Sequence, residues 1–388
     1  HQVVAAVAAL PGIEVQLASD RTFQLHRNGK IRVENKVNIR TMAELAHVYT
    51  PGVGRVSMAI HDNPDAVWSL TTKVNTVAIV TDGTAVLGLG DIGPEAAMPV
   101  MEGKAMLFKS FGEIDAWPLC LDTKDTEEII KIVKAVAPGF GGILLEDISA
   151  PRCFEIERRL REELDIPVFH DDQHGTAIVV AAALINGVKI RGCRMEDLRV
   201  TINGAGAAGI AVTKLLLGLG VGDIVLCDRN GAIYEGRTER MDFSKEEIAR
   251  MTNKERRTGS LSEVIVGSDV VIGLSGPGAL TPEMVASMAP NPLVFALANP
   301  TPEITPDLAL EAGALAVATG RSDYPNQVNN SLAFPGVFRG ALDVKARTID
   351  DTMKLAAARA IADLVDPAEA ERLVADQARD LCPRRGSL

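Results

Sequence analysis

The chain has 388 residues, of which 47% are hydrophobic and 23% charged, and its formal net charge is −11. At roughly 100–200 residues per domain, this length predicts two domains or three in an ordinary globular protein. The negative charge and the 4% of aromatic residues argue against nucleic-acid binding. No apolar run reaches the roughly 18 residues of a membrane span.

The cysteines and the N-terminal residues indicate where in the cell the protein is located. The five cysteines form no C-x-x-C pair, and we interpret them as reduced thiols: Cys120, Cys153, Cys193, Cys227 and Cys382. The start of the chain lacks the basic and apolar segments of a signal peptide. We therefore expect a cytoplasmic protein. Residues 1–25 are expected to be a remnant of an upstream domain, such as a regulatory one.

The first half of the chain alternates between short apolar runs and helical patterns. Two apolar runs, 75–81 and 85–89, flank Asp82-Gly83, which predicts a hairpin or tight turn. The pattern that follows predicts a helix, a strand, a helix and a strand, at 94–111, 142–146, 152–164 and 166–170. This rhythm is typical of a parallel sheet.

A second α/β stretch begins near Arg199. Its candidate parallel strands are 200–203, 224–227, 270–274, 293–298 and 314–318. From about Gly336 the chain is helical and rich in alanine, and we expect this segment to pack back on the first domain.

A glycine-rich turn joins the strand at 200–203 to a helix expected over 210–217. It reads Gly204-Ala205-Gly206-Ala207-Ala208-Gly209, the G-x-G-x-x-G fingerprint between a strand and a helix. The first glycine makes the turn, the second lets backbone approach a pyrophosphate, and the third lets helix and strand pack closely. The motif predicts a Rossmann-type sheet that binds NAD or NADP.

The next strand ends in Asp228, where an acid that binds the ribose 2′-hydroxyl of NAD belongs. Arg229 beside it offers a competing interpretation, in which the arginine pairs with the 2′-phosphate of NADP. We favour NAD and leave NADP open.

Two acid pairs follow strands of the first domain. Glu146-Asp147 ends one strand and Asp171-Asp172 follows the next. Parallel strands so connected can be neighbours about 4.8 Å apart, with both acid pairs at the edge where such sheets bind ligands. Four carboxylates there would repel each other without a cation. The sequence therefore predicts a Mg²⁺ or Mn²⁺ site.

Two alternatives apply to these acids. Helix capping would explain one acid of each pair, Asp147 and Asp172, but not both members. A zinc site would use His170 and His174, although histidines near strand ends are more often structural.

Lys104 lies within the apolar stripe of the helix expected over 94–111. Its neighbours at three, four and seven positions are Ala97, Val100, Met101, Leu107, Phe108 and Phe111. A buried lysine has a lowered pKa, which suits a general base. The alternative is a lysine whose stem packs while its ammonium reaches water. Tyr49, before the Pro51-Gly52 turn, is expected at a helix exit, and by pattern alone it is structural.

These motifs together resemble those of the small prokaryotic malic enzymes. The likeness covers roughly residues 26–365. The matching strings are YTPGV (49–53), VTDGTAVLGLGDIGPEAAMPVMEGKA (80–105), LEDISAPRCFEIE (145–157), FHDDQHGTAIV (169–179), NGAGAAG (203–209), CDRNGAIYEGR (227–237), FALANPTPEI (295–304) and ATGRSDYPNQVNN (318–330).

The resemblance implies oxidative decarboxylation of malate to pyruvate and carbon dioxide, with NAD or NADP and Mg²⁺ or Mn²⁺. It implies that Lys104 is the general base, Tyr49 the general acid, and Asp171 the acid that supports proton transfer at the lysine. The implied metal ligands are Glu146, Asp147 and Asp172. The asparagines implied near the substrate and nicotinamide are Asn299 and Asn330, with Asn329 as a further candidate.

One departure from the wider family leaves a role open. The Thr84-Ala85 segment lacks the arginine that larger eukaryotic members use for the substrate carboxylate. Two other functions also stay open: a 2-hydroxy-acid dehydrogenase that does not decarboxylate, and an inactive module that senses dinucleotides. The first needs no metal, and the second need not keep Lys104, Tyr49 and both acid pairs.

We therefore expect an α/β protein of two domains that acts as a homodimer or higher homo-oligomer. An α/β substrate and metal domain would span 26–185, and the Rossmann domain 186–335. The C-terminal helices, 336–388, would return to the first domain.

Overall fold

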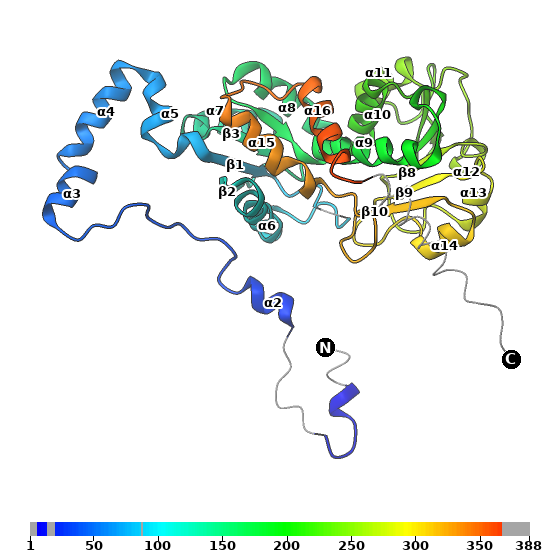
Figure 1. Cartoon of the computed structure of the whole chain (residues 1–388), viewed down its shortest axis with the longest axis horizontal. Helices are drawn as coiled ribbons and strands as arrows, with labels where there is room; N and C mark the ends of the chain where they lie inside the picture. The colour runs from blue at the N-terminus through cyan, green and yellow to red at the C-terminus, as the bar shows by residue number, and fades with distance from the viewer. Residues whose placement is uncertain (1–5, 14–19, 87, 367–388) are drawn as a thin grey trace.

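The chain folds into two parallel sheets with helices packed on their faces (Figure 1). The structure, a computed structural model, describes residues 6–13, 20–86 and 88–366. The expected α/β architecture of two domains is confirmed. Cys382 and the part of the C-terminal segment after residue 366 lie outside the described residues.

The first sheet has the order β2-β1-β3-β4 and is parallel throughout. Its strands are β1 (Thr76–Thr81), β2 (Asp115–Cys120), β3 (Gly142–Leu145) and β4 (Val168–His170). Every residue of β3 is buried, as a continuous apolar run predicts for a strand covered on both faces.

The expected hairpin at Asp82-Gly83 is wrong. β1 already pairs with β2 on one side and β3 on the other, so no edge is free for residues 85–89. Val86 makes only an isolated bridge to Gly90. The tight turn itself is present, because Gly83 has φ +68° and a Cβ there would lie 2.3 Å from the carbonyl of Gly93.

Four helices of the described part of the chain cover the first sheet. They are α6 (Pro94–Gly112), α7 (Thr126–Val136), α8 (Arg152–Glu163) and α15 (Phe334–Asp343). α15 comes from the C-terminal part of the chain and packs on α6 through edge-to-face contacts of Phe334 and Phe338 with Phe108.

The second sheet has the order β10-β9-β8-β5-β6-β7. Its strands are β5 (Arg199–Asn203), β6 (Asp223–Asp228), β7 (Gly231–Ala232), β8 (Val270–Gly273), β9 (Leu293–Ala296) and β10 (Ala316–Thr319). All pairs are parallel except β6 with β7, a two-residue antiparallel strand too short for its pattern to predict. Helix α10 (Ala207–Leu219) follows β5, and α11 (Phe243–Met251) follows β7.

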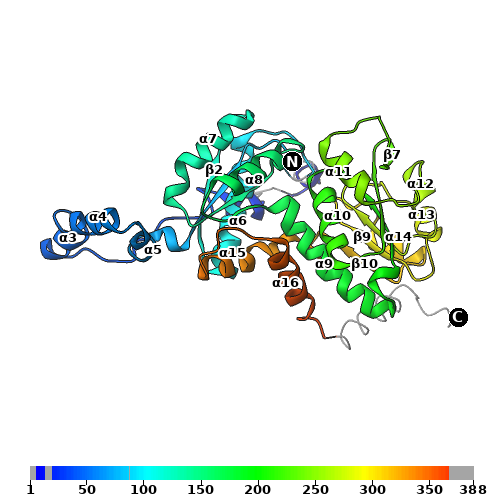
Figure 2. The ribbon, with the colours of Figure 1, turned by 90° about the horizontal axis from the view of Figure 1, so that it is seen from above.

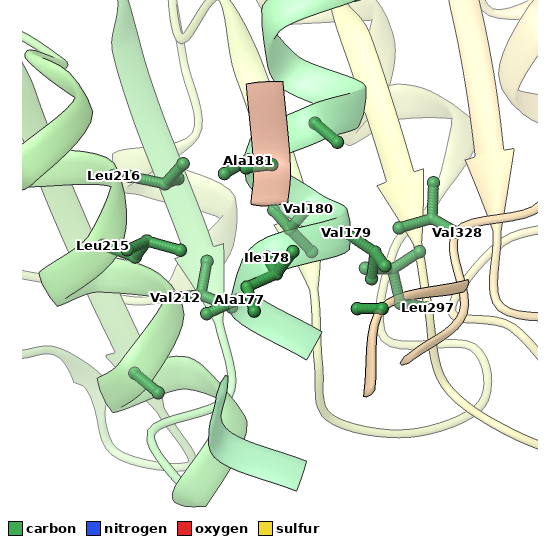
Figure 3. Close-up of a cluster of buried hydrophobic side chains, with 14 of the residues drawn as sticks. Ala177, Ile178, Val179, Val180, Ala181, Val212, Leu215, Leu216, Leu297 and Val328 are labelled. Atoms are coloured by element: carbon green, nitrogen blue, oxygen red, sulfur yellow. The ribbon is translucent and has the colours of Figure 1, made fainter. Parts of the chain in front are cut away.

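Helix α9 (Asp171–Arg191) joins the two sheets (Figure 2). Its first turn is polar, but residues 177–182 are all buried, which is the pattern of a helix covered on every side. Figure 3 shows this stretch between Val212, Leu215 and Leu216 of α10 and the side chains Leu297 and Val328. Helix α16 (Asp351–Ala362) packs on α9 as well. One continuous core therefore fixes the two sheets relative to each other.

Residues 32–62, which we call the N-terminal arm, contain no buried residue. The arm holds α3 (Met42–Val48) and α4 (Gly52–Asp62), and it is preceded by α2 (Arg21–His26) and followed by α5 (Val67–Leu70). Figure 1 shows α3 and α4 projecting away from both sheets. Thr41 and Glu44 form a capping box at the start of α3, and Tyr49 ends that helix as expected.

The remaining expectations concern membranes and thiols. Among the described helices, none is both long and apolar enough to cross a bilayer. Cys120, Cys153, Cys193 and Cys227 are free thiols, as expected.

Candidate active site

A cavity of about 780 Å³ lies between the two sheets. Residues from α6, the ends of β3 and β9, the first turns of α9 and α10, and the loop before α15 all line it. The predicted site residues among them are Lys104, Glu146, Asp147, Asp172, Ala208, Asn299 and Asn330. Segments far apart in the sequence therefore meet here.

The predicted carboxylate cluster is present at the carboxyl end of the first sheet. β3 and β4 pair in parallel with Leu145 opposite His170, which brings the acids after each strand to one edge. Ligand oxygens of Glu146, Asp147 and Asp172 lie within 4.8 Å of one another. The backbone N–H of Asp147 also donates to Asp172 Oδ2 at 2.9 Å, which fixes the two chain segments together.

This cluster fits a divalent cation. Glu146 Oε2 and, beside the cluster, Asp171 Oδ1 are buried without a hydrogen-bond partner. An ionised carboxylate can only accept hydrogen bonds, so each of these oxygens is free to face a cation. Burial raises the pKa of Glu146 well above its usual value, and the charges of neighbouring carboxylates add to this despite Lys104. A hard cation such as Mg²⁺ or Mn²⁺ stabilises such a set of oxygen ligands in their charged form.

The two alternatives for the acids are not supported. The group of potential metal ligands found in the described residues contains no His or Cys. His174 instead binds Glu157 at 2.9 Å, on α8. Capping also fails, because neither α8 nor α9 has a side-chain hydrogen bond at its N-cap.

Lys104 is buried and lines the cavity, as its position on the apolar stripe predicts. Its ammonium donates to Asp171 and lies 3.1 Å from Glu146 Oε1. It also donates to Asn330 Oδ1 at 3.2 Å and lies 4.8 Å from the ring centre of Phe334. The ammonium therefore has three oxygen partners inside the protein, which excludes a lysine that reaches out to water.

The expected lowered pKa of Lys104 is wrong. Burial does lower the pKa of this ammonium, but the charges of Asp171 and Glu146 and the hydrogen bond to Asp171 outweigh it and raise the pKa. The helix pattern showed only the apolar neighbours on α6, whereas the carboxylates come from α9 and from the end of β3.

Gly175 makes room for the contact between Lys104 and Asp171. It lies one turn after Asp171 on α9, and a Cβ there would be 1.9 Å from Asp171 Oδ1 and 3.0 Å from Asn330 Cβ. Only a residue without a side chain lets Asp171 and Asn330 approach Lys104 together. No motif in the sequence identifies this glycine.

The glycine fingerprint has the geometry that its motif requires. Gly204 has φ +125°, and a Cβ there would lie 2.3 Å from Leu274 O. A Cβ on Gly209 would lie 1.7 Å from Gly204 O, so this glycine sets the close packing of α10 on β5. Gly206 has open space in front of it, which is where a pyrophosphate approaches the N-terminus of the helix.

Asp228 ends β6 as expected, but its carboxylate is already bound to two cations. Arg237 lies 2.6 Å from Oδ1 and Lys245 2.8 Å from Oδ2. Burial alone would raise the pKa of Asp228, but the hydrogen bonds from Lys245 and Arg237 lower it. Arg229 is exposed. Asp228, predicted to bind the ribose end of the dinucleotide, is therefore part of a mixed charge cluster rather than a lone acid.

The predicted asparagines differ in the contacts that they make. Asn299 follows β9, and a Cβ on Gly88 of the first domain would lie 2.2 Å from its carbonyl, so the two domains touch here. The Asn329 side chain donates to Gly320 O and accepts from the Ser331 N–H, which is a structural role.

Lys30, which no motif identified, also lines the cavity and donates to Pro99 O at 2.7 Å.

Tyr49, predicted as the general acid, lies outside the cavity. It lies on the N-terminal arm, 63% exposed, and it is not among the lining residues. Figure 1 shows α3, the helix that ends at Tyr49, well separated from α6.

Known proteins resemble the chain along most of its length. Residues 28–161 match the family model described as malic enzyme, N-terminal domain, and residues 173–377 match malic enzyme, NAD binding domain. An NAD-dependent malic enzyme of Geobacillus stearothermophilus is 60% identical over 363 residues, 94% of this chain and 76% of that protein. An NADP-dependent malic enzyme of Rhizobium meliloti is 49% identical over 92% of this chain and 46% of that protein. The crystal structure of an NAD-dependent malic enzyme from Thermotoga maritima superposes with a TM-score of 0.88 at 47% identity, covering 94% of this chain and 99% of that one.

Proposed function

Because the chain belongs to the malic enzyme family, we propose that the residues gathered in its cavity carry out the oxidative decarboxylation of malate to pyruvate and carbon dioxide, with reduction of NAD or NADP. One observation carries this assignment of residues. Lys104 and the Glu146-Asp147-Asp172 group share one cavity with the first turn of the fingerprint helix, and Asp171 is hydrogen-bonded to Lys104.

A divalent cation and a nicotinamide cofactor, when bound, would supply part of the chemistry. A divalent cation held by Glu146, Asp147 and Asp172 would polarise the hydroxyl and carbonyl oxygens of the substrate and offset the negative charge around Lys104. A nicotinamide bound along Gly204–Gly209 would accept the hydride.

The chain's own residues transfer the protons. Lys104 takes the proton of the malate 2-hydroxyl, and Asp171, hydrogen-bonded to the same ammonium, passes it on. Although burial lowers the pKa of Lys104, the charges of Asp171 and Glu146 raise it above its usual value, so this amine acts as a base only when the surrounding carboxylate charge is offset. Asn330 orients the ammonium, and Asn299 borders the substrate and nicotinamide. Tyr49 gives a proton to carbon 3 once carbon dioxide has left.

The proposal also covers the cofactor preference, the cellular location, the oligomeric state and the domain boundaries. We expect NAD to be preferred, with Asp228 at the ribose end, although its pairing with Arg237 and Lys245 leaves room for NADP. We also expect a cytoplasmic homodimer or higher homo-oligomer. The domains would divide into 26–185, 186–335 and the C-terminal helices from 336.

A steady-state assay tests the reaction. Purified protein with malate and Mn²⁺ should release carbon dioxide in step with cofactor reduction, measured with NAD and NADP in parallel. Reduced cofactor without carbon dioxide would instead identify a dehydrogenase that does not decarboxylate. Dinucleotide binding without turnover would identify a sensing module.

Isotope exchange separates the roles of Lys104 and Tyr49. Pyruvate in deuterated water exchanges its methyl hydrogens only through the enolate step. Tyr49→Phe should lose this exchange, whereas Lys104→Ala should lose malate oxidation and keep more of the exchange. General acid–base help is worth roughly 10²–10⁴-fold, so each loss should be large. The reverse pattern would mean that the two roles are exchanged.

A further inference from the structure

A buried glutamate lies within the apolar stripe of α8. The buried residues of this helix are Cys153, Ile156, Glu157 and Leu160, which are spaced three and four positions apart. The three apolar members pack in the core of the first sheet, so α8 is firmly attached to that sheet. Glu157 is 5% exposed, and a buried carboxylate is costly unless it is hydrogen-bonded. The proton transfers described above do not use this carboxylate.

Three donors bind the two oxygens of the Glu157 carboxylate. The backbone N–H of His170 donates to Oε1 at 3.2 Å. The side-chain amide of Gln173 and Nε2 of His174 donate to Oε2 at 3.1 Å and 2.9 Å. These donors flank the Asp171-Asp172 pair, which we call the acid pair, at the junction of β4 and α9. Glu157 therefore holds the chain on both sides of the acid pair.

The start of α9 presents opposite faces to the active-site cavity and to Glu157. Asp172 and Thr176 line the active-site cavity. Gln173 and His174 instead line a second cavity, of about 840 Å³, together with Glu157. The carboxylate thus binds the helix from the side that faces away from the substrate, and it can restrain the acid pair without touching a substrate or a cation.

The contacts of the acid pair on the cavity side do not provide the same restraint. Asp172 Oδ2 accepts from the N–H of Asp147 at 2.9 Å, and Asp171 accepts from Lys104. Both donors belong to the site itself, so these bonds join the site residues to one another. The N-cap of α9 makes no side-chain hydrogen bond that would fix the start of the helix. Glu157, by contrast, ties this segment to the rigid framework of α8 and the first sheet.

We propose that Glu157 is a positioning residue, whose three hydrogen bonds fix the direction in which the acid pair faces the cation and Lys104. Hydrogen bonds are directional, whereas apolar packing is not, so a carboxylate can set an orientation that a leucine in the same stripe could not. Glutamine cannot replace it either, because an amide has one acceptor oxygen and its NH₂ group would face the donors. This inference rests on the metal site proposed above.

Mn²⁺ binding to the full chain, measured by titration calorimetry without substrate, tests the positioning. Glu157→Gln should weaken Mn²⁺ binding roughly 10–100-fold, the range found for groups that orient metal ligands. Its dissociation constant for NAD should not change, because Gly204–Gly209 belong to the other sheet. At saturating Mn²⁺ its kcat should still be low, since Asp171 also loses its orientation towards Lys104. Wild-type Mn²⁺ affinity in Glu157→Gln would overturn the proposal.

Two controls separate positioning from stability. Gly187→Ala crowds the Leu293 side chain on the same helix α9, with its Cβ 2.6 Å from Cδ1, and should lower the melting temperature but keep wild-type Mn²⁺ affinity. Glu162→Gln removes an exposed carboxylate from α8 and should change neither. If Gly187→Ala weakened Mn²⁺ binding as much as Glu157→Gln does, the loss would reflect general destabilisation, and the positioning role would be rejected.

Gln173→Met provides a second test that does not depend on Glu157→Gln folding. It removes one of the three donors, keeps the carboxylate and replaces the amide by a side chain of similar volume. Mn²⁺ binding should weaken roughly fivefold, the factor that one hydrogen bond is worth. A Gln173→Met variant that binds Mn²⁺ as tightly as wild type would count against the proposal in the same way.

Asp172→Asn distinguishes a failure of the metal site from a failure of the positioning role. If Asp172→Asn binds Mn²⁺ like wild type, the proposed metal site is wrong, and the role of Glu157 fails with it. If Asp172→Asn loses Mn²⁺ while Glu157→Gln and Gln173→Met retain it, the metal site stands and only the positioning role is refuted. Graded losses, largest in Asp172→Asn and smallest in Gln173→Met, are the expected result.

Discussion

The Lys104 ammonium donates a hydrogen bond of 3.2 Å to Asn330 Oδ1, 226 residues further along the chain. Lys104 belongs to α6 of the first domain, whereas Asn330 begins the turn that leads from the second domain into α15. The contact ties the proposed base to the segment that connects the dinucleotide-binding sheet with the C-terminal helices. The site therefore depends on residues from both domains.

Removal of the metal should abolish turnover. With EDTA the carboxylates at the end of β3 lose the cation that stabilises them, and added Mn²⁺ should restore activity. Asp172→Asn should weaken Mn²⁺ binding, measured by calorimetry, by more than the roughly 10–100-fold typical of outer-shell changes, while NAD still binds. The control Asp307→Asn changes an exposed acid and should behave as wild type. Full activity in metal-free buffer would contradict the metal site.

Gly175→Ala should reduce activity more than stability. The new Cβ would displace Asp171 and Asn330 from Lys104, since it would lie 1.9 Å from Asp171 Oδ1. Overpacking costs roughly 1–3 kcal/mol, so the fold should survive. Gly187→Ala is the matched control on the same helix, because its Cβ would meet only the Leu293 side chain, at 2.6 Å. It should lower the melting temperature without changing kcat. Equal kcat in both variants would show that Gly175 does not position the site.

Asp228→Ser should shift the cofactor preference towards NADP. The change removes the acid from the ribose end and releases Arg237 and Lys245, which then face a 2′-phosphate without a competing carboxylate. A lost hydrogen bond to a charged group is worth roughly 1.5–3 kcal/mol, or about tenfold or more in KM for NAD. Asp223→Ser, at the other end of β6, serves as the control. Equal changes in KM for both cofactors would mean that Asp228 does not read the 2′ position.

Glu157 should contribute a pH-dependent part of the stability. It is buried, and although burial alone would raise its pKa, the charge and hydrogen bond of His174 lower it from 4.5 to about 2. The backbone of His170 and the amide of Gln173 also donate to this carboxylate. A carboxyl with a lowered folded-state pKa stabilises the protein above its unfolded pKa, and this contribution disappears as the pH falls through the folded value.

The test compares Glu157→Gln with wild type by thermal unfolding between pH 7 and pH 3. The variant should melt at a lower temperature at pH 7, and the difference should shrink as the pH falls below 4.5. Glu162→Gln, exposed on the same helix, should melt like wild type throughout. A difference that stays constant or grows in acid would contradict the assigned direction of the pKa shift.

Local patterns were sufficient for much of this site. The fingerprint at 204–209 and the acids after β3 and β4 were predictable because strand ends, turns and periodicity depend on residues that are close in sequence. For the same reason the apolar stripe of α6 predicted that Lys104 is buried. The roles proposed for these residues rest on the resemblance to malic enzymes. The matching family models confirm membership of that family, whereas the residue roles stay predictions.

Other properties depend on which distant segments meet. The direction of the Lys104 pKa shift is set by Asp171, 67 residues away, and the pairing of Asp228 by cations that follow β7. The absence of a hairpin after β1 follows from strands that occupy both of its edges. The position of Tyr49 outside the cavity is a property of the arm as a whole. In each case a charge, an edge or a surface acts through a neighbour in space, and no periodicity along the chain encodes that neighbour.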